Sequence, residues 1–309
     1  AEVMCAHRAV QSTGVYRAIP RLRSWLGGSA GSGKSTTLKT IVQHVRLLFQ
    51  EARVDATVEL TAYTGVAAFN IGFGAKTACS SFRISPKAPW KSELTGDAFK
   101  KLEDQWRRVE LLIVDEISFF GRAFFARMHF RLQQAKHRSF TESERDANEY
   151  TFGDLSILLV GDFGQLEPID DVSMCDTATT WQTCPKPMRH LMTHVRMGKY
   201  LLETFQEAVM LQKIHRSKDD LWWTESCLRL RDFDCTHDDY DWWRAHDLDH
   251  GHFTEAQKAY FESEAVWLCA RCEDVGSRNG RKLAHMALDK HLLVHKISAT
   301  HSHPRGHKK

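Results

Sequence analysis

The chain has 309 residues, of which 42% are hydrophobic and 26% are charged, a balance typical of globular proteins and a length sufficient for two domains. No apolar run approaches about 18 residues, and Ala1–Val10 lacks the apolar core of a signal peptide, so we expect an intracellular protein without a membrane span. The net charge of +3 is too small to indicate nucleic-acid binding by itself. Because the sequence begins with Ala1, we expect a processed product or a fragment.

Residue types that ligate metals are present but poorly spaced for a metal site. Cys269 and Cys272 form a CxxC pair, and no second pair follows at zinc-site spacing. We therefore expect Cys269 to end a buried strand and Cys272 to begin a helix, with reduced thiols, and keep a metal site as the alternative. The basic, His-rich residues 301–309 are interpreted as a solvated tail rather than a metal-binding tract.

The segment Gly28–Ser35 has the GxxxxGK[ST] spacing of a P-loop, with Leu22–Leu26 before it as a short strand and Thr36–Phe49 after it as a helix. Such a loop turns backbone N–H groups toward phosphate oxygens at a helix N-terminus. The Lys34 ammonium is expected to reach the β- and γ-phosphates of ATP, and the Ser35 hydroxyl to bind Mg²⁺. The alternative is a linker rich in Gly and Ser. The expected nucleotide contacts are Gly28, Ser29, Ala30, Gly31, Ser32, Gly33, Lys34, Ser35 and Thr36.

A second strand, Glu110–Val114, ends in two adjacent carboxylates. The carboxyl end of a central parallel strand lies beside the phosphate loop, so we expect Asp115 to hold Mg²⁺. Glu116 would then orient or deprotonate the attacking water. The pair favours hydrolysis over phosphoryl transfer to another substrate, although an acidic helix cap after the strand is the alternative.

A third apolar run, Ser156–Val160, leads into Gly161-Asp-Phe-Gly-Gln165. A polar amide just after this strand can contact the γ-phosphate and distinguish ATP from ADP. We therefore interpret Gln165 as a sensor that couples chemistry to conformation. By itself, Gln165 would be an ordinary loop amide.

Beyond the P-loop, further motifs occur in the order found in the Pif-type helicases of the RecD-like branch of superfamily one, which the chain resembles from about Leu26 to Leu288. These motifs are Thr61–Ile71, Thr77–Phe82, Asp115–Ser118, Gly161–Ile169 and Leu211–Arg216. The resemblance implies an α/β fold: two tandem RecA-like P-loop domains whose parallel sheets are flanked by helices. It also implies an ATP-dependent, Mg²⁺-dependent 5′-to-3′ DNA helicase acting on single-stranded and forked duplex DNA.

By the same resemblance, Lys34, Glu116, Gln165 and Arg216 are the catalytic residues. Arg216 would be an arginine finger supplied by the second domain, which stabilises charge in the transition state. The family is associated with DNA repair, recombination and telomere maintenance, so we expect a nuclear location in a eukaryote, or a mitochondrial one. No membrane and no obligate protein partner are implied.

The first-domain candidates for single-strand binding lie in the two motifs between the P-loop and Asp115. Single-strand binding needs phosphate contacts and stacking platforms. For Phe69 and Phe82, a place in the core is the favoured alternative. The candidates are Thr64, Gly65, Phe69, Ser80 and Phe82.

The sequence also departs from the family in several places. Tyr63 and Glu167 stand where the family usually has proline, Cys79 stands where it usually has histidine, and Gln11 is a poor match to an adenine-reading Q-motif. No later arginine has the setting of the family's last motif, so the second domain is expected to be incomplete through C-terminal truncation. A truncated helicase that binds ATP and DNA without unwinding, or a P-loop kinase, are the alternatives.

The expected organisation places four segments along the chain. They are a lead-in at 1–20, a first RecA-like domain at 21–190, a partial second one at 198–300 and the tail at 301–309.

Overall fold

A computed structural model describes residues 21–85, 90–91, 93–136, 151–180, 182–184, 186–249 and 251–295. The chain forms two compact units, one ending at Asp234 and the other starting at Cys235. The predicted lead-in with Gln11 and the predicted tail lie outside the described residues.

The first unit is built on a parallel sheet whose six described strands have the order β3-β2-β4-β5-β1-β6. The predicted strands at Leu22–Leu26, Glu110–Val114 and Ser156–Val160 are confirmed as β1, β4 and β5, and the α/β class is confirmed with them. The strands are β1 (Arg23–Gly28), β2 (Thr57–Ala62), β3 (Lys76–Thr77), β4 (Val109–Asp115), β5 (Ser156–Gly161) and β6 (Glu207–Leu211).

Helices cover both faces of this sheet, because alternate side chains of a strand point to opposite sides. Leu111 of β4 packs in one core with Leu38 of the helix that follows the P-loop, which confirms the predicted helix at Thr36–Phe49. Leu112, the next residue, packs in the other core. The helices of this unit are α2 (Lys34–Glu51), α3 (Gly65–Ile71), α4 (Ala78–Ser81), α5 (Gly96–Trp106), α6 (Arg122–Lys136), α7 (Met192–Glu203) and α8 (Leu221–Arg231), with short 3-10 turns at Ile117–Phe119, Thr151–Asp154 and Lys186–Leu191.

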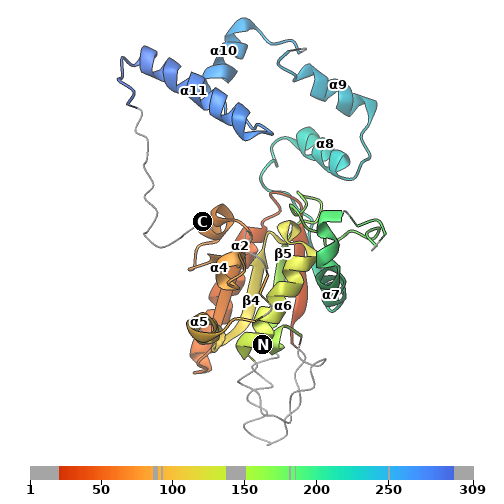
Figure 1. Ribbon diagram of the computed structural model, residues 1–309. Coiled ribbons are helices and arrows are strands. Elements are labelled where there is room, and N and C mark those ends of the chain that lie inside the picture. Colours follow the sequence, from red (N-terminus) through yellow and green to blue (C-terminus); the bar gives the residue numbers. More distant parts are fainter. Residues whose placement is uncertain are drawn as a thin grey trace, which may run out of the picture. The chain divides into compact units, whose positions relative to one another are not determined.

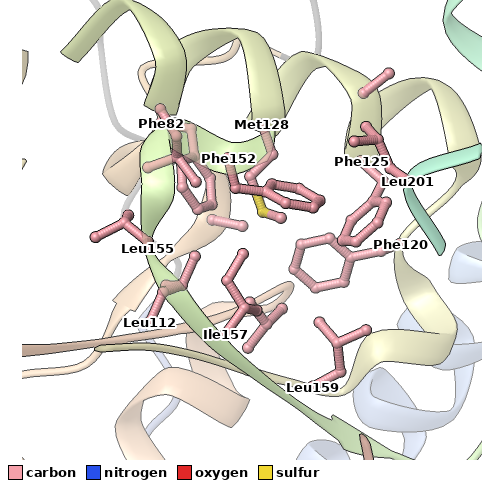
Figure 2. Close-up of a cluster of buried hydrophobic side chains, with 14 of the residues drawn as sticks. Phe82, Leu112, Phe120, Phe125, Met128, Phe152, Leu155, Ile157, Leu159 and Leu201 are labelled. Atoms are coloured by element: carbon pink, nitrogen blue, oxygen red, sulfur yellow. The ribbon is translucent and has the colours of Figure 1, made fainter. Parts of the chain in front are cut away.

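The larger core is rich in aromatic rings. Figure 2 shows Phe120, Phe125 and Phe152 converging with Met128 above the residues of β4 and β5. The ring centroids of Phe125 and Phe152 are 5.1 Å apart, within the range of favourable aromatic pairs. This core anchors α6 to the sheet and so fixes the face opposite α2.

The first unit extends past the predicted boundary at residue 190. Helix α7 lies beside α6 (Figure 1), and β6 pairs with β1 at the edge of the sheet. Four of the five residues in β6 are exposed. An exposed edge strand lacks the continuous apolar run that marks a buried parallel strand, so its pattern gave no sign that it belonged to this sheet.

The second unit contains three described helices: α9 (His237–Ala245), α10 (Glu255–Glu264) and α11 (Cys272–Asp289). The predicted helix at Glu273–Leu288 is confirmed by α11, which begins at Cys272 as expected. Capping boxes start α9 at Thr236 and α10 at Thr254. The interpretation of this unit as part of a second RecA-like domain stays a prediction.

The predicted strand at Val266–Ala270, with Cys269 at its end, is wrong. These residues are irregular and unpaired, and Val266 and Leu268 are 90% and 97% exposed. A strand needs a neighbour for its backbone N–H and C=O groups, and the described residues of this unit contain no other strand. The described residues also contain no group of three or more His, Cys, Asp or Glu side chains placed to hold a metal ion, and no described helix is long and apolar enough to cross a bilayer.

The buried His129 should make the first unit sensitive to acid. Its Nδ1 accepts a 2.9 Å hydrogen bond from the Phe152 backbone N–H, which requires a neutral ring, and burial lowers the pKa of His129 from 6.5 to about 4. The stability that the neutral ring contributes is complete above pH 6.5 and is lost as the pH falls toward 4. We expect this loss to be about 3 kcal/mol over that window.

The free energy of unfolding in urea, measured at several pH values between 7.5 and 4.5 for the wild type and for His129→Gln, tests this expectation. Buried carboxylates such as Asp115 titrate in both proteins, so their contribution cancels in the difference. An equal pH dependence in the two proteins would contradict the assignment.

Candidate active site

The P-loop joins β1 to α2 and is folded tightly on itself. Gly31 has a left-handed backbone, with φ of 82°, and a Cβ placed on it would lie 2.6 Å from the Cβ of Arg216. A residue with a side chain would therefore be strained and would clash at this position. The backbone N–H of His215 also donates a 2.8 Å hydrogen bond to the Gly31 carbonyl, so the chain after β6 crosses the loop here.

Lys34 lies across the P-loop. Its Nζ donates hydrogen bonds to the carbonyl oxygens of Gly28 at 2.6 Å and Ser29 at 3.1 Å. Burial lowers the pKa of Lys34, and the nearby carboxylates of Asp162, Glu116 and Asp115 oppose that shift. The structure thus brings the predicted lysine into the electrostatic range of both predicted acidic residues.

Asp115 ends β4 at this edge of the sheet, and Glu116 follows it directly. The Asp115 side chain is buried, its Oδ1 accepts a 2.9 Å hydrogen bond from the Glu116 N–H, and burial raises its pKa to about 6. Glu116 itself is held in the left-handed region, with φ of 55° and ψ of 47°. Non-glycine residues in this region are uncommon and often occur at functional sites.

The residues at hand fit a magnesium ion. Mg²⁺ prefers oxygen ligands, typically one or two carboxylates together with phosphate oxygens and waters. Asp115 provides a buried carboxylate whose charge is unfavourable without a cation, and Ser35 provides a hydroxyl in the first turn of α2.

The Gln165 loop is shaped by an aspartate that the sequence analysis did not single out. Asp162 is buried, its Oδ1 accepts a 3.0 Å hydrogen bond from the Gly164 N–H, and its carbonyl accepts one of 3.0 Å from the Gln165 N–H. This turn places the half-buried Gln165 at the same sheet edge as Asp115. The position of Asp162 directly after the apolar strand β5 was the sequence signal that could have identified it as a site residue.

Arg231, the last residue of α8, also reaches the site, where it contacts both Ser29 and Asp162. No pattern in the sequence marked this residue. Arg216 lies beside Gly31 of the P-loop and is exposed. It belongs to the first unit, which ends at Asp234.

An open pocket of about 620 Å³ adjoins the P-loop. One side is formed by the loop and the start of α2, and the other by the end of β6 and the residues after it. The size and the mixed polar and apolar lining suit a small organic ligand. The lining residues are Ser32, Gly33, Thr36, Thr37, Met210, Leu211, Gln212, Lys213 and His215.

The candidates for DNA contact separate into exposed and structural residues. Phe69 is 86% exposed on α3, whereas Phe82 is 0% exposed and stacks on Trp106 with ring centroids 5.2 Å apart. The assignment of Phe82 to DNA is therefore wrong, because its ring is part of the core, and the favoured core placement of Phe69 is also wrong. Gly65 and Ser80 are exposed, while Thr64 caps α3 by accepting a 3.1 Å hydrogen bond from the Ala67 N–H.

The departure from the family at Tyr63 has a packing explanation. The Tyr63 ring lies 6.0 Å from that of Phe119 and 5.5 Å from that of Phe120, measured between centroids. The tyrosine thus joins the end of β2 to the turn that follows Glu116.

The PIF1-like helicase family matches residues 20–210, which is more than half of the chain and contains every motif described so far except the one ending at Arg216. The chain belongs to this family. Among curated PIF1-like helicases, the chain is 27% identical over 199 residues to the ATP-dependent DNA helicase RRM3 of Saccharomyces cerevisiae, covering 62% of this chain and 23% of that protein. It is 28% identical over 199 residues to the ATP-dependent DNA helicase PIF3 of Trypanosoma brucei brucei, covering 59% and 21%.

Solved structures of PIF1-like helicases share the fold. Bacteroides Pif1 bound to single-stranded DNA superposes with a TM-score of 0.59 at 21% identity, covering 92% of this chain and 56% of that one. Pif1 of Candida albicans superposes with a TM-score of 0.57 at 24% identity, covering 90% and 53%. The chain therefore spans about a fifth of the length of these curated relatives and just over half of the solved chains.

The two phenylalanines should respond oppositely to truncation. Phe82→Ala removes a buried ring, so we expect a loss of about 3–5 kcal/mol in the free energy of unfolding. Phe69→Ala removes an exposed ring, so we expect a change within about 0.5 kcal/mol. Urea denaturation of both variants measures this difference, and comparable losses would contradict the placement of Phe69.

Proposed function

We propose that the chain is the ATPase part of a DNA helicase, which hydrolyses ATP with Mg²⁺ and couples hydrolysis to 5′-to-3′ movement on single-stranded DNA and to unwinding of forked duplexes. The observation that carries the proposal is the convergence of Lys34, Asp115, Glu116 and the Gln165 turn at one edge of a parallel sheet. A phosphate-binding lysine beside two carboxylates and an amide is the set that nucleotide hydrolysis requires.

Each residue has a distinct role in the proposed reaction. The P-loop N–H groups and Lys34 bind the phosphates, and the adjoining pocket accepts the rest of the nucleotide. Mg²⁺, when bound through Ser35 and Asp115, neutralises charge on the phosphate oxygens. Glu116 orients and deprotonates the attacking water, Gln165 contacts the γ-phosphate, and Arg216 stabilises the charge that develops on it.

DNA binding is proposed for the surface formed by α3 and α4, which follow the end of β2. Relatives support DNA and a nucleotide as the ligands, since solved Pif1 structures include complexes with single-stranded DNA and with ADP-AlF₄, and one describes unwinding at forked duplex DNA. The exposed Phe69 ring offers a stacking platform, and Gly65 and Ser80 lie in the first turns of α3 and α4.

Two substitutions test the ATPase. Glu116→Gln keeps the side-chain shape but removes the base, so we expect hydrolysis to fall by about 100-fold or more while nucleotide affinity changes little. Lys34→Ala should weaken nucleotide binding and hydrolysis together. Phosphate release and calorimetric titration with ATP measure the two effects, and a wild type that binds no ATP would overturn the proposal.

A third substitution tests the coupling to DNA. Single-stranded DNA should stimulate hydrolysis, and Phe69→Ala should weaken DNA binding by about 1–3 kcal/mol through lost stacking. Fluorescence anisotropy with labelled oligonucleotides, repeated at increasing salt, measures this effect. A strand-displacement assay on a fork then separates unwinding from ATP hydrolysis that is merely stimulated by DNA.

A further inference from the structure

Arg231 connects three elements at the proposed nucleotide site. It is the last residue of α8, and its guanidinium donates a 2.8 Å hydrogen bond to the Ser29 hydroxyl in the P-loop. A second nitrogen lies 2.9 Å from Oδ1 of Asp162, at the start of the Gln165 turn. One side chain thus holds the P-loop and the turn after β5 against α8.

The surroundings of Arg231 fit this contact closely. The Asp162 side chain is only 4% exposed, so its charge needs a partner, and Arg231 provides an ion pair with hydrogen-bond geometry. A Cβ on Gly164 would lie 2.3 Å from Nε of Arg231, so this loop residue leaves room for the arginine. The carboxylate that receives Arg231 also attracts Lys34, which places both cations around Asp162.

We propose that Arg231 is a positioning residue for ATP hydrolysis, which fixes the P-loop and the Gln165 turn relative to each other and joins both to α8. The inference rests on the proposed ATPase function. Because Asp162 accepts from both Arg231 and the Gly164 N–H, a shift of the arginine alters the turn that carries Gln165.

The Arg231–Asp162 contact would also connect the position of α8 to whether ATP or ADP is bound at the proposed site. The segment that contains α8 touches the P-loop region at both ends, through His215 on Gly31 and through Arg231 on Ser29. Between them, Asp220 caps α8 by accepting a 2.9 Å hydrogen bond from the Trp223 N–H. A change in the Gln165 turn on hydrolysis is therefore transmitted to α8 through the Arg231–Asp162 pair, and movement of α8 acts back on Gln165.

The test compares Arg231→Gln, Arg231→Lys and Asp162→Asn in the full chain, with Arg108→Gln as a matched control. Arg108 pairs with Asp55 on the surface, just before β4 and at the end of that strand remote from Asp115. We expect Arg231→Gln to lower kcat about tenfold or more while KM for ATP changes by less than about threefold, since positioning rather than nucleotide affinity is lost. Arg231→Lys should recover little, because an ammonium lacks the guanidinium fork that spans two acceptors.

The double variant Arg231→Gln/Asp162→Asn should lower kcat no more than the more severe single variant, as expected for residues that act as a unit. Additive effects, or an unchanged kcat in Arg231→Gln with normal thermal stability, would overturn the inference while leaving the proposed function intact.

Amide hydrogen exchange separates failure of the inference from failure of the proposed function. If the wild type hydrolyses no ATP, the proposed function fails, and the contact is judged by exchange alone. Faster exchange at residues 162–166 in Arg231→Gln than in Arg108→Gln supports the positioning role, and equal exchange overturns it.

Discussion

The parallel alignment of β4, β5 and β1 is the constraint on which the site depends. Gly27 of β1 is in register with Gly161 of β5, and Val114 of β4 is in register with Leu159. Strands that run in the same direction end at the same edge, so the residues after each strand meet there. The P-loop, the Asp115–Glu116 pair and the Gln165 turn are separated by many residues in sequence and are brought to one edge of the sheet by this register. The same register aligns Ala62 of β2 with Asp115, which places Tyr63 and α3 beside the carboxylates.

Bringing several carboxylates to a partly buried edge of the sheet makes their charged forms unfavourable, and the fold compensates Asp162 and Asp115 to different extents. Asp162 is buried but has an arginine within 2.9 Å. Asp115 has the Glu116 N–H as a hydrogen-bond donor, and burial raises its pKa to about 6. The proposed Mg²⁺ would favour the charged form of Asp115, whereas Asp162 already has Arg231 as its partner. The left-handed backbone of Glu116 adds local strain that the rigid end of β4 must support.

Local patterns were sufficient for the parts of the site whose signal lies within one element. The P-loop spacing and the apolar runs of β1, β4 and β5 predict buried strands, each followed by residues that act on the nucleotide. Those strands formed as expected. Phe69 and Phe82 could not be separated in this way, because one lies in the short helix α3 and the other directly after the short helix α4, and only the tertiary contact with Trp106 marks Phe82 as a core residue. The strand predicted at Val266–Ala270 failed for a similar reason, since an apolar run becomes a strand only where another strand pairs with it. Arg231 had no local signal, because its role comes from a contact with residues 69 and 202 positions away.

The end of β5, which leads into the Gln165 turn, also packs directly against the turn that follows Glu116. A Cβ on Gly161 would lie 2.9 Å from the Ile117 backbone nitrogen and 3.0 Å from the Ile117 Cγ2, so the end of β5 closely approaches the turn after Glu116. The strand that leads into the Gln165 turn therefore packs against the backbone next to Glu116, and this contact would couple the proposed γ-phosphate sensor to the proposed water-activating residue. Tyr63 extends this contact to the end of β2 through Phe119 and Phe120. From the P-loop to α3, the proposed steps of phosphate sensing, hydrolysis and DNA contact thus share one continuous set of packed residues, which is the physical requirement for coupling one to another.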